Sequence, residues 1–193
     1  MAKYSKDYIV DLALKVIGEK GLEKATLREI AKEGGVSTGA IYHYFKNKEE
    51  LLYEVMDSRL KVSSEVASDK NLKDKSKKEI IDQIMMSIME RFEKTSENKI
   101  QFYLLKEAIK GDEYLKEGFE SKYDSWTNQI KKVLRYLYDT TDEKKLDAMA
   151  MFLLGAIDGL IMRHTLNDDA IDIAMIGEIY EMIFRSELKE YFS

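Results

Sequence analysis

Apolar residues recur every three or four positions along most of this chain, and no proline interrupts them. The first segment shows the spacing clearly and ends before Gly21. Its apolar face consists of Ile9, Leu12, Ala13, Val16 and Ile17. This is the period of an amphipathic helix, and proline is the residue that most strongly breaks helix interiors. The pattern predicts an all-α protein in which no segment needs to form a β-strand.

Helix starts and stops can be placed from cap residues. The four-residue stretches that begin at Thr26 and at Ser76 both match a capping box, in which the first hydroxyl and the last carboxylate bind backbone amides. Ser37 and Asn47 are further N-cap candidates, and the Gly34-Gly35 pair suits a helix end. We expect helices over residues 47–60, 76–92, 100–109, 113–137, 142–164 and 169–191. The lysine-rich residues 63–78 are typical of a solvated connection, with a basic tract for DNA as the alternative.

Most signatures of catalysis and metal binding are missing from the sequence. There is no Cys, which excludes disulfides and thiolate zinc sites, and the two His residues lie on different segments. The Gly-x-Gly-x-x-Gly pattern of dinucleotide-binding enzymes is absent. We therefore expect no enzyme, no metal and no cofactor.

The longest uninterrupted apolar run covers residues 148–157, whereas a membrane-spanning helix needs about 20 apolar residues. We therefore expect no membrane partner. No secretory signal is visible at the N-terminus, so a cytoplasmic location is expected.

The last two expected helices are apolar most of the way round. A single chain covers only part of such a surface, so we expect a two-fold homodimer that buries the rest. The expected interface residues are Phe152, Gly155, Ala156, Gly159, Ile176, Ile179, Tyr180 and Ile183. Alternatively, Gly155 and Gly159 accommodate a bulky neighbour of the same chain.

Residues 26–46 have the pattern of two short helices joined by a glycine turn. Their apolar residues are spaced to pack against the helix of residues 8–19, which makes a three-helix unit with a helix-turn-helix. The residues left outward on the second short helix are small or hydrogen-bonding, and none is acidic; they are Ser37, Thr38, Gly39, Tyr42 and His43. Such a surface is compatible with a DNA groove.

At these residues the chain resembles the TetR family of bacterial transcriptional regulators. The shared positions run through Gly21-Leu22, Thr26, Ile30-Ala31, Gly35-Val36-Ser37, Gly39, Ile41-Tyr42, Tyr44-Phe45, Lys48-Glu49 and Leu51. Gly34 departs from the family, which more often has Ala there. The resemblance implies a DNA-binding domain over residues 3–63 and a ligand-binding and dimerisation domain over residues 64–193.

The resemblance also implies roles for individual residues. Thr26 is expected to hold a phosphate at a helix N-terminus, and Arg28 to read a base. The full expected DNA-contact set is Thr26, Arg28, Ser37, Thr38, Gly39, Ala40, Tyr42, His43, Tyr44, Lys46 and Lys48. Two alternatives stay open, because His43 could be a solvent-exposed ring and Tyr44 a core aromatic.

The family pattern implies an apolar effector cavity in the second domain. Candidate lining residues are Met89, Phe92, Phe102, Tyr103, Tyr123, Trp126, Met151 and His164, each of which could equally be ordinary core. Their character suits a small hydrophobic or aromatic effector.

The expected function is a repressor that such an effector releases from a palindromic operator. A carrier protein, a helical enzyme and an activator are the alternatives. The whole chain has a net charge of −5, which by itself argues against DNA binding. Residues 1–48, however, hold nine Lys or Arg against six acidic residues, so the expected DNA-binding part is basic.

Overall fold

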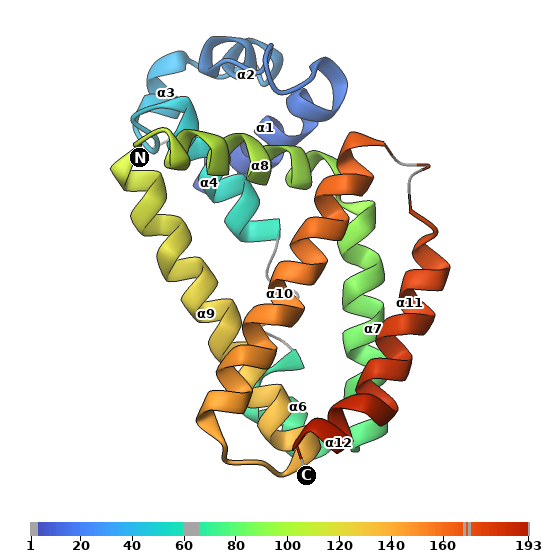
Figure 1. Cartoon of the computed structure of the whole chain (residues 1–193). Helices are drawn as coiled ribbons and strands as arrows, with labels where there is room; N and C mark the ends of the chain where they lie inside the picture. Colours follow the sequence, from blue (N-terminus) through green and yellow to red (C-terminus); the bar gives the residue numbers. More distant parts are fainter. Residues whose placement is uncertain (1–3, 60–65, 168, 170, 193) are drawn as a thin grey trace. The chain divides into compact units, whose positions relative to one another are not determined.

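A computed structural model of the chain describes residues 4–59, 66–167, 169 and 171–192, and every regular element within these residues is helical. The all-α expectation is therefore confirmed. The chain packs into two units (Figure 1). The first unit comprises Met1–Leu60 and Thr95–Phe119, and the second comprises Lys61–Lys94 and Glu120–Ser193.

The first unit contains five complete helices. They are α1 (Lys6–Lys20), α2 (Leu27–Glu33), α3 (Thr38–Tyr42), α4 (Lys48–Arg59) and α8 (Thr95–Ile109). The apolar face predicted for residues 9–17 is buried, as are Ile30 of α2, Ile41 of α3 and Phe45, which follows α3. These side chains form the core that holds α2 and α3 against α1. Helix α4 packs against both α1 and α8.

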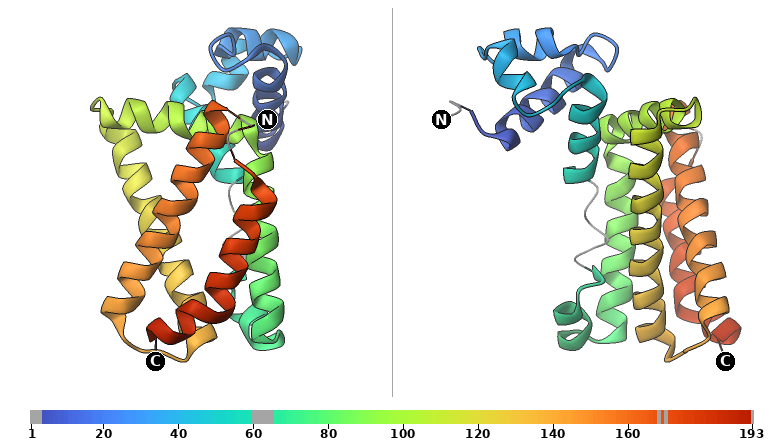
Figure 2. Two further views of the ribbon diagram at one scale, coloured as in Figure 1. Left: turned by 45° about the vertical axis from the view of Figure 1, so that its right-hand side comes forward. Right: turned by 90° about the vertical axis from the view of Figure 1, so that its left-hand side faces the viewer.

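The second unit is a bundle of long helices, which Figure 2 shows from two sides. Its elements are α6 (Asp69–Asp74), α7 (Lys77–Glu93), most of α9 (Glu113–Tyr138), α10 (Glu143–Leu166), α11 (Ile173–Met182), the π-helix η2 (Ile183–Glu187) and α12 (Leu188–Phe192). Both α10 and α11 pack against α7. The core joins Ile80 of α7, Leu134 of α9 and Leu146 of α10 to Phe184 and Phe192 near the C-terminus.

Local signals placed most helix starts correctly. Ser37 and Ser76 cap α3 and α7, and Ser76 forms the complete capping box with Glu79. Asn47 accepts a hydrogen bond from the Glu50 amide at the start of α4. Leu60, the last residue expected in that helix, lies outside the described residues.

Three expectations need correction. Residues 63–78 are not simply a connection, because α6 occupies Asp69–Asp74, while residues 63–65 lie outside the described residues. The segment 169–191 is not one helix, since a π-helical turn separates α11 from α12. The helix expected over 100–109 begins earlier, at Thr95.

The expected domain limits at residues 3 and 63/64 also lie outside the described residues. The packing units follow a different division, because α8 and the first turns of α9 pack with α4. The boundary between units at residues 119 and 120 falls within the continuous helix α9.

Candidate nucleic-acid interface

The helix-turn-helix is built from two capped helices and a glycine turn. Thr26 caps α2 by accepting a hydrogen bond from the Glu29 amide (3.2 Å), and Ser37 caps α3 by accepting one from the Ala40 amide (3.1 Å). Between them Gly35 has φ +60°, a left-handed conformation that glycine adopts without steric cost. The turn thus lies between two helix N-termini, and the positive dipole end of each favours anions.

Only half of the capping box expected at Thr26 is present. The Glu29 carboxylate binds the Lys20 ammonium (2.7 Å) instead of completing the box, and Lys20 also pairs with Glu33. These hydrogen bonds raise the pKa of Lys20 and lower the pKa of Glu29. The acidic side chains of α2 are therefore held by a lysine of α1.

The outward surface of α2 and α3 carries hydroxyl, imidazole and cationic groups. The expected contact residues that are exposed are Thr26, Arg28, Ser37, Gly39, Tyr42, His43 and Lys46. Thr38, Ala40, Tyr44 and Lys48 are half-buried. No acidic residue lies on α3, so nothing on this helix repels a phosphate backbone.

The side chains of Tyr44 and Lys48 make hydrogen bonds inside the first unit to residues distant in the sequence. The Tyr44 hydroxyl donates to the Tyr4 carbonyl (2.9 Å), and the Lys48 ammonium donates to the Leu22 carbonyl (2.7 Å). Lys48 also lies 5.7 Å from the centre of the Tyr103 ring. No local sequence signal points to these contacts, because each joins residues at least 26 positions apart.

The candidate effector residues fall into both units. Phe102 and Tyr103 lie in the first unit, where the Tyr103 hydroxyl donates to the Glu49 carboxylate (3.2 Å). Burial and the Glu49 carboxylate raise the pKa of Tyr103. Met89, Phe92, Tyr123, Trp126, Met151 and His164 lie in the second unit.

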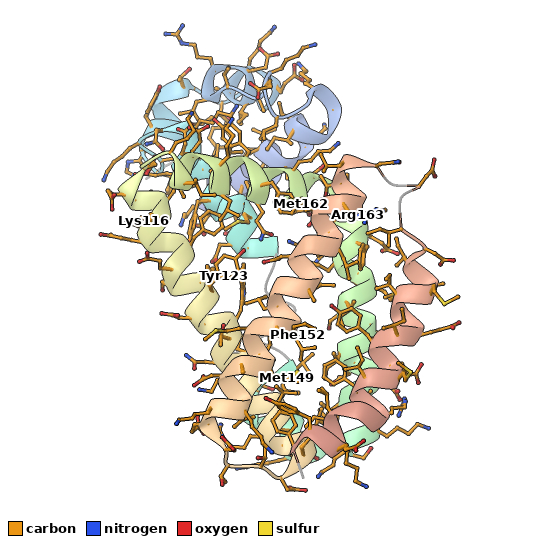
Figure 3. The ribbon with its side chains drawn as sticks, in the orientation of Figure 1. Lys116, Tyr123, Met149, Phe152, Met162 and Arg163 are labelled. Carbon is orange, nitrogen blue, oxygen red and sulfur yellow. The ribbon has the colours of Figure 1, made fainter. Side chains whose placement is uncertain are left out.

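Four of the candidate effector residues form two aromatic pairs within the second unit. Phe92 is buried, and its ring meets the His164 ring edge to face at 5.5 Å. The Tyr123 hydroxyl donates to the Asp158 carboxylate (2.8 Å), and its ring packs against Trp126 at 5.3 Å. Figure 3 shows Tyr123 on α9. Met151 stands apart, with 61% of its surface exposed.

The residues expected at a dimer interface divide by exposure. Phe152, Gly155 and Ile179 are exposed, whereas Ala156, Gly159, Ile176 and Ile183 are half-buried. The expectation for Tyr180 needs correction, because this residue is only 5% exposed and belongs to the core of its own unit. Its helix is apolar on several sides, so the sequence pattern did not distinguish the inward side.

The Tyr180 hydroxyl has no hydrogen-bond partner among the described residues, and the same holds for the buried Nδ1 of His164 and Oγ1 of Thr165. Burial raises the pKa of Tyr180 to about 12. Unpaired polar atoms of this kind are unfavourable in a closed core.

Within the described part of the chain, no group of three or more His, Asp or Glu side chains is arranged to hold a metal ion. The same residues include no helix that is both long and apolar enough to cross a membrane.

The sequence is similar to known regulators. Residues 9–55 match the family model described as bacterial regulatory proteins, tetR family. Over 166 residues the chain is 29% identical to the HTH-type transcriptional regulator PksA of Bacillus subtilis, a match that covers 82% of this chain and 78% of PksA.

The fold is also similar to solved structures. One is the transcriptional regulator FadR from Bacillus subtilis in complex with stearoyl-CoA, with a TM-score of 0.70, 21% identity, and coverage of 92% of this chain and 96% of FadR. Another is BioQ with its double-stranded DNA operator, with a TM-score of 0.63, 19% identity, and coverage of 97% and 99%. At these levels of identity, the two structures establish similarity of fold alone.

Proposed function

We propose that this chain is a member of the tetR family of bacterial regulatory proteins, and so a DNA-binding transcriptional regulator rather than an enzyme. Within that family, we propose that it is a cytoplasmic repressor released from its operator by a small molecule. The observation that carries the proposal is the surface of α3. It starts at a capped N-terminus, bears no acidic residue and exposes Tyr42 and His43.

We assign DNA contacts to both helices of the helix-turn-helix. Thr26 and Arg28 lie at the start of α2, where the positive end of the helix dipole would favour a phosphate. Thr38, Gly39 and Ala40 begin α3, and their small size would let the backbone approach base edges. Tyr42, His43 and Lys46 follow as phosphate contacts.

We also propose that the protein is a homodimer joined through the exposed apolar faces of α10 and α11. Phe152 and Met151 of α10 are each more than half exposed, as is Met175 of α11, and Figure 3 places Phe152 along α10. A Cβ atom added at Gly155 or Gly159 would meet no atom within 4 Å. This open space favours approach of a second copy over accommodation of a neighbour in the same chain.

A dimer of this kind would bind a palindromic operator. Its two copies of α3 would enter major grooves about 34–36 Å apart on one face of the DNA. An effector that binds more tightly to a dimer with another spacing would release the operator, since coupling is a difference in affinity between states.

We place the effector in the second unit. The support is the aromatic contacts of Phe92 with His164 and of Tyr123 with Trp126, together with the unpaired Tyr180 hydroxyl. These groups suit a hydrophobic or aromatic molecule that carries a polar group. The structurally similar FadR was crystallised with stearoyl-CoA, a molecule with an apolar tail, and this supports a site for such a molecule in the second unit.

The DNA contacts can be tested by selecting duplexes from random DNA with the full chain and then measuring affinity. We expect Tyr42→Ala to weaken binding about tenfold while the dimer persists. Tyr114→Ala is a matched control, because Tyr42 and Tyr114 are both 55% exposed and lie in the same unit. Unchanged affinity in Tyr42→Ala would refute the assignment. No enriched duplex with the wild-type chain would favour a carrier protein instead.

The dimer can be tested by sedimentation. Phe152→Arg places a charge in the proposed interface, so we expect monomers and loss of operator binding. Met86→Arg is the matched control, since Met86 on α7 is 63% exposed and Phe152 is 65% exposed. A dimer that persists in Phe152→Arg would contradict the proposed interface.

A further inference from the structure

Three tyrosines connect the residues before and at the start of α1 to the helix-turn-helix. The Tyr44 hydroxyl donates to the Tyr4 carbonyl at 2.9 Å. The Tyr4 hydroxyl donates to the Gly35 carbonyl and the Tyr8 hydroxyl to the Gly34 carbonyl, each at 3.4 Å. We call Tyr4, Tyr8 and Tyr44 the tyrosine clamp.

The tyrosine clamp binds the turn between α2 and α3, which positions α3. Gly34 and Gly35 form the link between α2 and α3, and both carbonyls receive a clamp hydroxyl. The rings of Tyr4 and Tyr8 stack at 5.5 Å, so the two contacts act together. Since both bonds to the turn are long, ring packing supports them, and the shorter bond from Tyr44 closes the clamp.

Tyr44 lies where the clamp meets the recognition surface. It is the second residue after α3, and its ring packs edge to face against that of His43 at 4.8 Å. Tyr44 is half-buried, whereas Tyr42 on α3 is exposed. The family resemblance implies a DNA contact for Tyr44, but its hydroxyl donates a hydrogen bond within the protein.

We infer that Tyr44 is a positioning residue, which orients the recognition helix through Tyr4 and the Gly34-Gly35 turn instead of contacting DNA. This inference rests on the proposed function of α3. The loss of the clamp would leave the phosphate-binding charges in place but misplace the groups that read bases. Selective binding should therefore fall while affinity for unrelated DNA persists.

A double-mutant cycle tests the inference. Tyr44→Phe removes only the hydroxyl, and Tyr4→Ala removes the ring that anchors the acceptor carbonyl. We expect Tyr44→Phe to weaken binding to a duplex selected from random DNA about fivefold, the equivalent of one net hydrogen bond. In the Tyr4→Ala background the same change should alter affinity less than about twofold, because its partner is already displaced.

Specificity separates positioning from general destabilisation. We expect affinity for a scrambled duplex to change less than about twofold in all clamp variants, so that the ratio of selected to scrambled binding falls. Tyr53→Phe is the matched control, since the Tyr53 hydroxyl donates to the Gly118 carbonyl at 3.0 Å in the same unit. It should lower thermal stability and leave the ratio unchanged. Tyr4→Phe retains the ring, so it should retain the effect of Tyr44→Phe.

Additive losses in Tyr4→Ala/Tyr44→Phe would show that Tyr44 acts on DNA directly, and they would overturn the inference. An unchanged ratio in Tyr44→Phe would also overturn it. A wild-type chain that enriches no duplex would overturn the proposed function itself.

Discussion

Adding one methyl group at Gly34 tests how tightly the first unit is packed around its turn. Gly34 has φ −86° and ψ −3°, which alanine adopts without strain, so the backbone alone would favour the substitution by about 0.4–1 kcal/mol. The added methyl group, however, would clash with a neighbouring side chain. A Cβ atom at Gly34 would lie 2.1 Å from Cδ2 of Leu12, which is held in the core of α1.

The magnitude follows from the overlap. Carbon atoms pack best about 3.5–4.0 Å apart, so the Leu12 methyl must move by about 1.5 Å. Overpacking of this kind costs about 1–3 kcal/mol. After the backbone gain is subtracted, we expect Gly34→Ala to lower the free energy of unfolding by about 1–2 kcal/mol.

The assay is urea unfolding followed by circular dichroism at one protomer concentration, because the proposed dimer would make stability concentration-dependent. Leu12→Ala supplies the control background. It costs about 2–5 kcal/mol by itself, but it opens the space that the new methyl needs. In that background Gly34→Ala should stabilise the protein. Equal destabilisation in both backgrounds, or stabilisation of the wild-type chain, would refute the reasoning.

Two further predictions concern the second unit. Ser76→Ala removes the N-cap of α7 and should lower the free energy of unfolding by about 1 kcal/mol in the same assay, whereas an unchanged value would mean that water replaces the cap. The hydrogen bonds from Ser76 lower the pKa of Glu79, so this variant should also lose less stability as pH falls below the ordinary range of a glutamate. Tyr180→Phe removes a buried hydroxyl without a partner among the described residues and should stabilise the chain by about 1 kcal/mol. Because the folded state keeps the Tyr180 proton up to about pH 12 while an unfolded tyrosine loses it near pH 10, stability should fall across that interval, and less steeply in Tyr180→Phe. A destabilised variant with the wild-type alkaline slope would contradict this.

Interactions between residues close in the sequence made much of the fold predictable. The caps at Ser37, Asn47 and Ser76 depend on hydrogen bonds across three residues, and such bonds can be inferred from neighbouring side chains. The same is true of Gly35, whose left-handed conformation suits a turn. At Thr26 the local prediction was half right, because Lys20 of another helix competes for Glu29.

Placement of the candidate site was less predictable. The outward groups of α3 could be inferred from periodicity, because Ile41 is the buried residue of this helix. Tyr44 could not be resolved in this way, since its partner Tyr4 lies 40 positions earlier. Tyr103 was grouped with the effector residues on composition, yet it bonds Glu49 in the first unit.

By itself, the sequence determined that this chain is helical, where most helices begin, and that residues 26–46 form a helix-turn-helix. These properties depend on the spacing of apolar residues and on hydrogen bonds within one turn of helix. Only the tertiary structure decided that α8 packs with α4, that Tyr180 faces the core, and that Tyr44 closes a clamp on the turn. A helix with several apolar sides does not specify which side is buried. That choice depends on partners distant in the sequence.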